Sequence, residues 1–157
     1  MAYYVRKLPR LSGYDYSQNG YYFITVCTHQ KRLLFGSIHK QAMMLSDIGT
    51  VIENELLQIP VRYDGVRIDA YTIMPNHLHC IIVIEKPEPF GKYPTLSEIV
   101  GLYKSGVTKQ LHLSKPKMII WQKSFYNLIL RDNAAYLGVL RYIEENPRKW
   151  ESDEYYG

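Results

Sequence analysis

The sequence predicts one α+β domain spanning residues 1–157, in which an antiparallel sheet packs against helices. Three observations lead to this prediction. The 157 residues are 46% apolar and 13% aromatic, which is enough for the core of one domain. Four short runs rich in β-branched and aromatic residues indicate strands, and three longer runs with apolar residues at helical spacing indicate helices. Their order is strand, helix, strand, strand, helix, strand, helix.

The first half of the chain supplies one strand, one helix and one hairpin. Residues 20–30, GYYFITVCTHQ, follow an Asn-Gly step and predict the first strand. Residues 46–60 begin with N-cap residue types and continue with apolar side chains at helical spacing, so they predict a helix. Residues 66–74 and 77–85 alternate or run apolar on either side of Pro75-Asn76, which predicts two strands joined by a turn.

The second half supplies a long helix, a strand and a final helix. Residues 95–113 begin with a capping-box pattern and predict the long helix. The fourth strand is predicted at 125–130, FYNLIL, and the final helix at 132–146, ended by Pro147. The order βαββαβ predicts a ferredoxin-like antiparallel sheet with helices on one face, followed by an additional C-terminal helix.

The charge distribution suggests a polyanionic partner. The net charge is only +4, but residues 1–40 hold six Lys or Arg against one acid, and residues 101–150 hold nine against three. Acidic residues collect between 41 and 100, eight against four basic residues. Basic side chains contact phosphates and tyrosine rings stack on bases, so nucleic acid fits this pattern. An ordinary solvated surface is the alternative explanation.

Cysteine use and the absence of targeting patterns indicate a cytoplasmic protein. Cys27 and Cys80 both lie in apolar, strand-like runs and are expected to be buried free thiols. The N-terminal residues carry charges without a following apolar segment, and no apolar run approaches membrane-spanning length. We therefore expect no secretory leader and no membrane partner.

Two histidines begin the third predicted strand. Side chains two positions apart on a strand point to the same face, so His77 and His79 present their imidazoles together. A His-x-His pair on a strand aims two neutral nitrogens at one metal ion, whereas a lone histidine is more often a core or surface residue. We expect both imidazoles to face an open site rather than the core.

A tyrosine and an asparagine share one face of the final helix. Tyr142 and Asn146 are four residues apart and therefore lie about one turn from each other. They are candidates for a nucleophile and a third metal ligand. The alternative is that Tyr142 merely edges the core, and Tyr126, near the end of the fourth strand, is a rival nucleophile. His29, His39 and His112 have no partner at ligand spacing and are expected to be surface or packing residues.

Four segments in this order resemble the single-tyrosine HUH transposases, especially the REP-associated tyrosine transposases: GYDYSQNGYYFITVCTHQKRLLFG, MPNHLHCIIVI, WQKSFYNLILRD and LRYIEENPRKW. The resemblance runs from about residue 9 to residue 150. It implies that His77 and His79 bind a divalent metal, Mg²⁺ or Mn²⁺, that Tyr142 is the nucleophile, and that Asn146 is the third ligand.

The resemblance also implies an activity and partners. The implied activity is that of a metal-dependent endonuclease and strand transferase, which cleaves single-stranded DNA at hairpin-forming repeats through a covalent 5′-phosphotyrosine. The expected partner is single-stranded or hairpin DNA. The expected localisation is the cytoplasm, in association with the nucleoid, and the expected oligomeric state is a monomer or a homodimer. Basic residues expected to contact DNA lie in the N-terminal segment and the second long helix: Arg6, Lys7, Arg10, Lys104 and Lys109.

Two other functions remain open from the sequence. The first is a non-catalytic, ferredoxin-like module that binds single-stranded nucleic acid. The second is a metal-independent phosphodiesterase, which needs two His-x-Ser/Thr segments, whereas this chain has one His-x-His. The short acidic tail ESDEYYG lacks the basic extension of some relatives, which argues against a tail that assists DNA binding.

Overall fold

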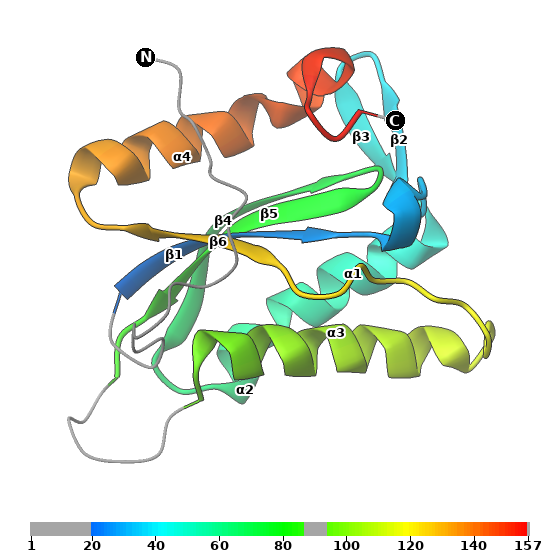
Figure 1. Cartoon of the computed structure of the whole chain (residues 1–157), viewed down its shortest axis with the longest axis horizontal. Helices are drawn as coiled ribbons and strands as arrows, with labels where there is room; N and C mark the ends of the chain where they lie inside the picture. Colours follow the sequence, from blue (N-terminus) through cyan, green and yellow to red (C-terminus); the bar gives the residue numbers. More distant parts are fainter. Residues whose placement is uncertain (1–19, 87–93, 157) are drawn as a thin grey trace.

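A four-stranded antiparallel sheet forms the centre of the molecule (Figure 1). A computed structural model describes residues 20–86 and 94–156 of the chain. The strands are β1 (Gly20–Cys27), β4 (Val66–Met74), β5 (His77–Ile84) and β6 (Tyr126–Leu130), in the spatial order β4-β5-β1-β6 with antiparallel neighbours. Because β1 and β5 are central, the two helical connections cross over the sheet, as the predicted βαββαβ order requires.

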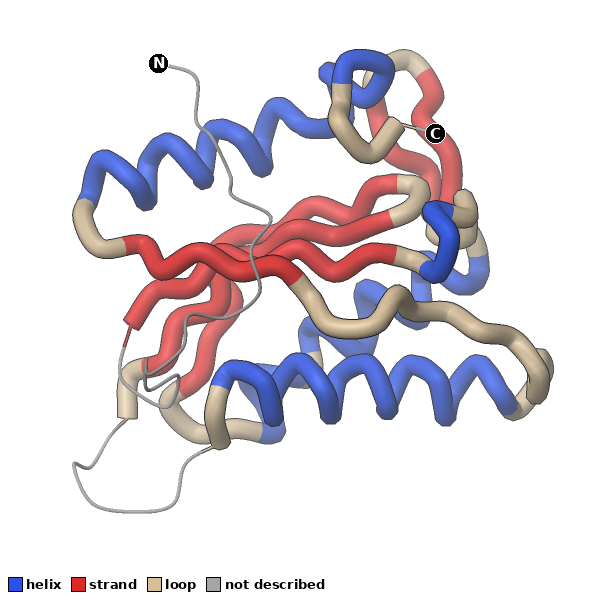
Figure 2. Tube along the Cα trace, in the orientation of Figure 1, coloured by secondary structure: helices blue, strands red, loops and turns tan. Residues whose placement is uncertain are grey.

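Helices cover both faces of this sheet (Figure 2). α1 (Asp47–Leu57), α2 (Ile59–Arg62) and α3 (Leu96–His112) lie on one face, and α4 (Asn133–Glu145) lies on the other (Figure 1). The three long helices begin at side-chain caps, where Ser46, Thr95 and Asp132 each accept a backbone N–H of the first turn. The predicted α+β class is therefore confirmed.

Alternation along β5 divides the core into two parts. Leu78, Cys80 and Ile82 pack against the face covered by α1 and α3, whereas Ile81 and Val83 pack against α4. Every residue of β5 is buried, because a central strand covered on both faces has no solvent side. This alternation determines which face of the sheet the two histidines occupy.

One hairpin was not predicted from the sequence. β2 (Gly36–His39) and β3 (Ala42–Leu45) pair as a separate two-stranded sheet. Its turn residues, Lys40 and Gln41, have φ of 49° and 64°, a conformation that Asn and Gly adopt more readily. The turn therefore lacks the residues that would have marked it.

Other boundaries differ slightly from the prediction. The first strand ends at Cys27 rather than at residue 30, because a 3-10 turn, η1 (His29–Lys31), follows with Gln30 and Lys31 at positive φ. After α4 the chain continues as a 3-10 segment, η2 (Asn146–Ser152). Cys27 and Cys80 are both buried, as expected, and neither forms a disulfide among the described residues. Within the described ranges, no helix has the length and apolar character needed to cross a membrane.

Candidate metal and nucleophile site

The two histidines lie side by side on the α4 face of the sheet. His77 pairs with Cys27 of β1, and His79 pairs with Thr25, so both imidazoles project on the same side as Ile81. Their ring centroids are 4.6 Å apart. The predicted shared orientation is thus present, and it follows from the two-residue period of the strand.

Each imidazole is oriented by a hydrogen bond at Nδ1. His77 Nδ1 lies 2.8 Å from Asn76 Oδ1, and His79 Nδ1 lies 2.7 Å from Thr25 Oγ1. Asn76 Nδ2 donates to the backbone oxygen of Tyr155 at 2.7 Å, which identifies Oδ1 as the acceptor for His77. A neutral His77 then carries its proton on Nδ1 and presents the lone pair of Nε2, as metal-binding histidines do.

Tyr142 projects from α4 toward His79. The two ring centroids are 5.2 Å apart, and the Tyr142 ring also meets Phe23 edge to face at 6.1 Å. Burial and the negative charge of Asp153 raise the pKa of Tyr142 to about 12, while the neighbouring Asn146 amide lowers it to a smaller extent. The phenol is therefore protonated near neutral pH and is a weak nucleophile without assistance.

Asn146 lies one turn beyond Tyr142, at the end of α4. Its Nδ2 donates to the backbone oxygen of Tyr142 at 3.1 Å, and the side chain is only 3% exposed. Among residues 20–86 and 94–156, its Oδ1 has no hydrogen-bond partner. A buried amide oxygen without a partner is costly, so a ligand or a water at this position would be stabilising.

The C-terminal segment covers the histidines, which the sequence did not predict. Tyr155 is 3% exposed, and its ring centroid lies 4.4 Å from that of His77 and 5.9 Å from that of His79. The Trp150 ring lies 6.2 Å from the His77 ring. As a result His77 is 0% and His79 is 1% exposed. The expectation that both imidazoles face an open site was therefore wrong, because residues following α4 fold back over them.

The same segment brings a carboxylate to the histidines. Potential ligand atoms of His77, His79 and Asp153 all lie within 4.8 Å of one another. Sequence reasoning missed Asp153, because it treated the acidic tail only by its net charge. In the sequence, Asp153 was only a weak signal of a metal ligand, because no local pattern places it beside His77 and His79.

Sequence comparison shows which family the chain belongs to. No family model matches the chain. An uncharacterized protein of Haemophilus influenzae is 37% identical over 167 aligned positions, which cover 96% of this chain and 93% of that protein. The chain belongs to the same family as this Haemophilus protein.

Solved structures identify the fold. A REP-associated tyrosine transposase bound to a REP hairpin superposes with a TM-score of 0.61 at 19% identity, over 90% of this chain and 74% of that chain. A candidate transposase from Deinococcus radiodurans superposes with a TM-score of 0.54 at 15% identity, over 87% and 96%. The chain has the REP-associated tyrosine transposase fold. The resemblance stated from the sequence motifs is confirmed at this level.

In this transposase fold Tyr126, the alternative nucleophile, lies in the same row of the sheet as His79. Thr25 of β1 pairs with His79 on one side and with Tyr126 of β6 on the other. The Tyr126 hydroxyl accepts a hydrogen bond from Gln122 Nε2 at 3.4 Å. Of these two candidates, Tyr142 has its ring against the ring of His79, with 5.2 Å between the centroids. The choice of Tyr142 as the nucleophile stays a prediction.

Of the predicted DNA-binding residues, the two that the structure describes lie on the other face of the sheet from this site. Arg6, Lys7 and Arg10 fall outside the described residues. Lys104 and Lys109 are on α3, on the sheet face opposite α4 (Figure 1). Lys104 Nζ donates to the backbone oxygens of Gln122 and Ser124 at 2.8 and 2.9 Å, so it fixes a loop in this structure. Their contact with DNA stays a prediction.

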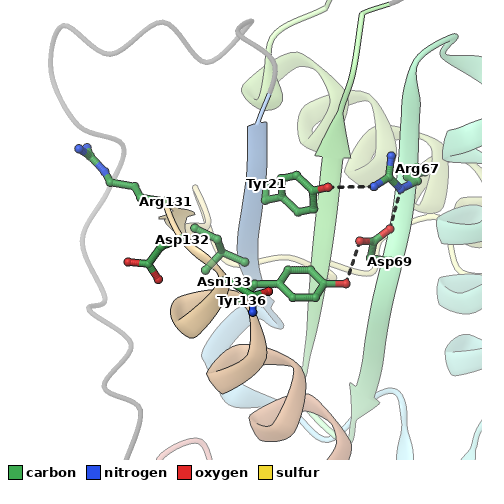
Figure 3. Close-up of a pocket in the computed structure, with 8 residues that line it drawn as sticks. Tyr21, Arg67, Asp69, Arg131, Asp132, Asn133 and Tyr136 are labelled. Atoms are coloured by element: carbon green, nitrogen blue, oxygen red, sulfur yellow. Dashed lines mark hydrogen bonds and ion pairs between the residues drawn. The ribbon is translucent and has the colours of Figure 1, made fainter.

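Among the described residues, one hollow lies at the N-terminal end of α4. It has a volume of about 490 Å³ and contains a polar network (Figure 3). There Asp69 accepts hydrogen bonds from Arg67 Nε at 2.7 Å and from the Tyr136 hydroxyl at 2.9 Å, and Arg67 also donates to the Tyr21 hydroxyl at 3.2 Å. The network links β1, β4 and α4 and is internally paired.

A second hollow, the hairpin groove, lies between the β2–β3 hairpin and η2 and has a volume of about 580 Å³. Its lining includes the cations Lys40, Arg148 and Lys149 and the aromatic residues Trp150 and Tyr156. The Trp150 and Tyr156 rings meet edge to face at 5.2 Å. Cations beside aromatic rings are the combination that binds single-stranded nucleic acid. The sequence reading did not single out these residues.

Proposed function

We propose that this chain is a metal-dependent DNA nicking and joining enzyme of the single-tyrosine HUH type. It would cleave single-stranded DNA at hairpin-forming repeats and hold one end as a covalent 5′-phosphotyrosine. The observation that carries the proposal is the contact between Tyr142 and His79, with His77 beside them on the same sheet face. The solved transposase of the same fold is bound to a REP hairpin, which supports DNA as the substrate.

The side chains at this site fit a divalent cation. The Nδ1 hydrogen bonds hold both imidazoles, and the Oδ1 of Asn146, which has no hydrogen-bond partner among the described residues, supplies an amide oxygen one helical turn from Tyr142. Imidazole and oxygen ligands together suit Mn²⁺, and an oxygen-rich set completed by phosphate suits Mg²⁺. When bound, such an ion supplies positive charge that stabilises the charge developing on a phosphate oxygen.

Tyr142 would carry out the covalent step. Its phenolic oxygen forms a bond to phosphorus, the bond from phosphorus to the 3′ oxygen breaks, and the phenolic proton is transferred in net terms to that 3′ oxygen. The products are a 5′-phosphotyrosine and a free 3′ hydroxyl. One phosphoester replaces another, so the reverse reaction can reseal the strand without a nucleotide cofactor.

The raised pKa of Tyr142 means that its hydroxyl needs activation by neighbouring groups. Its pKa of about 12 leaves about one phenol in 10⁴ ionised at pH 8, from the difference of four pH units. Packing against Phe23 and His79 holds the ring in one orientation, which lowers the entropic cost of reaching the attack geometry. Removal of negative charge near the phenol would favour the reactive phenolate.

The hairpin groove is the surface best suited to hold the DNA strand. It is bordered by η2, which begins at Asn146, and one of its aromatic residues, Trp150, also contacts His77. Lys40 and Arg148 are exposed, and Lys149 pairs with Glu145 at 2.7 Å. A strand bound there would lie close to Tyr142 with its phosphates against lysine and arginine.

A second candidate function has one observation in its favour. Both histidines are buried beneath Tyr155, as structural histidines in a core would be. A non-catalytic module that binds single-stranded DNA would need neither imidazole exposed. It gives no reason for two imidazoles to be oriented side by side, with the ring of His79 against that of Tyr142.

Formation of a covalent adduct separates the two functions. The protein is incubated with end-labelled single-stranded DNA containing a hairpin, in Mn²⁺ or Mg²⁺, and the products are resolved on a denaturing gel. The expected result is a labelled protein band that requires metal, with the DNA mapped to Tyr142 by peptide mass spectrometry. DNA binding without any adduct at either metal would favour the non-catalytic module.

A further inference from the structure

Asp153 stands at the end of η2, where the chain turns back toward the sheet. Its backbone is extended, with φ −72° and ψ 141°, and its Oδ1 accepts the backbone N–H of Tyr155 at 2.7 Å. This bond fixes the carboxylate relative to the following residues, as in an Asx turn. The side chain is half-buried and reaches the imidazoles of His77 and His79.

We propose that Asp153 is a ligand of the same divalent cation as His77 and His79. This inference rests on the proposed metal site and adds a residue to which the sequence analysis gave no role. The three potential ligand atoms lie within 4.8 Å of one another, a spacing that one cation can bridge with small side-chain adjustments. Two imidazoles and one carboxylate form a set used by divalent metals with open coordination positions.

The arrangement gives the cation a second role. Asn146 is the first residue of η2 and Asp153 follows its last, so ligands at both ends would clamp this 3-10 segment to β5. Tyr155 lies between the segment and His77, and its backbone oxygen is held by Asn76. Cation binding is then coupled to docking of residues 146–156, since a ligand that binds only the docked state stabilises it.

The charge of Asp153 supports ligation over simple packing. A carboxylate drawn toward two buried imidazoles loses hydration, and neutral imidazoles do not compensate its charge. A bound cation would compensate this charge, and so would protonation of a histidine. These two explanations predict opposite responses to removal of the charge, because a carboxylate that pairs with protonated histidine competes with the metal.

Metal affinity measured with the full chain and Mn²⁺ alone separates them. Asp153→Asn keeps the size of the side chain and an oxygen that can accept the Tyr155 N–H, whereas Glu154→Gln removes the same charge at the adjacent, exposed position. Titration calorimetry should show Mn²⁺ affinity lowered at least ~10-fold by Asp153→Asn, since even partners of ligands contribute that much. Glu154→Gln should stay within about twofold.

Hydrogen exchange supplies the second readout. Mn²⁺ should protect the backbone amides of residues 148–156 in the natural chain and in Glu154→Gln, and the protection should be lost in Asp153→Asn. Unchanged or tighter Mn²⁺ binding by Asp153→Asn overturns the inference while leaving a site of His77 and His79 in place. Absence of Mn²⁺ binding in the natural chain overturns both this inference and the proposed metal site.

Discussion

The ring of Tyr155 lies against the ring of His77, with 4.4 Å between centroids and an interplanar angle of 35°. This contact joins the last described residues of the chain to the first residue of β5. It explains why a histidine pair expected in an open site is instead buried. Anything that binds Nε2 of His77 therefore has to share space with the C-terminal segment or displace it.

Replacement of Tyr155 should uncover the histidines. Tyr155→Ala removes a buried ring, so we expect the free energy of unfolding to fall by about 3 kcal/mol, and His77 to become reactive toward diethylpyrocarbonate. The measurements are urea denaturation and peptide mapping of the modified histidine. Tyr156→Ala is the matched control, because that ring is 53% exposed. Equal reactivity of His77 in both variants would contradict the covering role.

Removal of one hydroxyl should abolish chemistry and leave binding. Tyr142→Phe keeps the ring that packs on Phe23 and His79, so stability and DNA affinity should change little, while the covalent adduct disappears. Tyr126→Phe is the control, since Tyr126 lies on the same sheet face. The adduct and affinity are measured by denaturing gel and fluorescence anisotropy. Adduct lost only in Tyr126→Phe would transfer the nucleophilic role to that residue.

The rate of adduct formation should increase with pH. The pKa of Tyr142 is raised from 10 to about 12, so the phenol remains protonated through pH 9 and its ionised fraction grows about tenfold per pH unit. Single-turnover rates measured from pH 7 to pH 9 at saturating Mn²⁺ should rise without a plateau. A rate independent of pH over this range would mean that loss of the phenolic proton does not limit the step.

Each histidine should matter for both metal binding and stability. His77→Ala and His79→Ala should eliminate Mn²⁺ binding seen by calorimetry. Because both side chains are buried and hydrogen-bonded at Nδ1, each change should also cost about 1 to 3 kcal/mol of unfolding free energy. Imidazoles in an open site, as expected from the sequence, would have been replaced with little loss of stability. His39→Ala, at an exposed position, is the control. Lost stability with Mn²⁺ affinity intact would make the pair structural.

The sequence predicted the elements that depend on local patterns. The period of β5 placed His77 and His79 on one face, and the four-residue spacing placed Asn146 one turn from Tyr142; the structure has both relationships. The contact of Tyr155 with Asn76 joins residues 79 positions apart and leaves no periodic signal. The position of Asp153 beside the histidines was missed for the same reason, since tertiary contacts of an irregular segment follow from packing and not from local propensity.

The hairpin groove gives a prediction about DNA affinity. Lys40→Ala combined with Arg148→Ala removes two exposed cations beside Trp150 and Tyr156, so single-stranded DNA should bind more weakly and with a smaller dependence on salt. The slope of log K against log salt should fall by roughly 0.7 per lost phosphate contact. Lys115→Ala with Lys117→Ala makes the same charge change in the turn after α3. Equal effects of the two pairs would point to net charge instead of a local site.

The N-terminal basic residues give the last prediction, which concerns a segment outside the described residues. Arg6, Lys7 and Arg10 lie within the first ten residues, and replacing all three with Ala should weaken binding of hairpin DNA across sequences if they contact phosphates. The salt slope should then fall by roughly 0.7 to 0.9 per lost contact. If one of them reads a base edge, discrimination against the wrong base should fall by about 1 to 3 kcal/mol.

Anisotropy titrations with matched and mismatched hairpins at several salt concentrations distinguish a phosphate contact from a base contact, because a phosphate contact affects every hairpin equally. Affinity and slope that do not change would show that DNA binding depends on other residues, with the hairpin groove as the first surface to test.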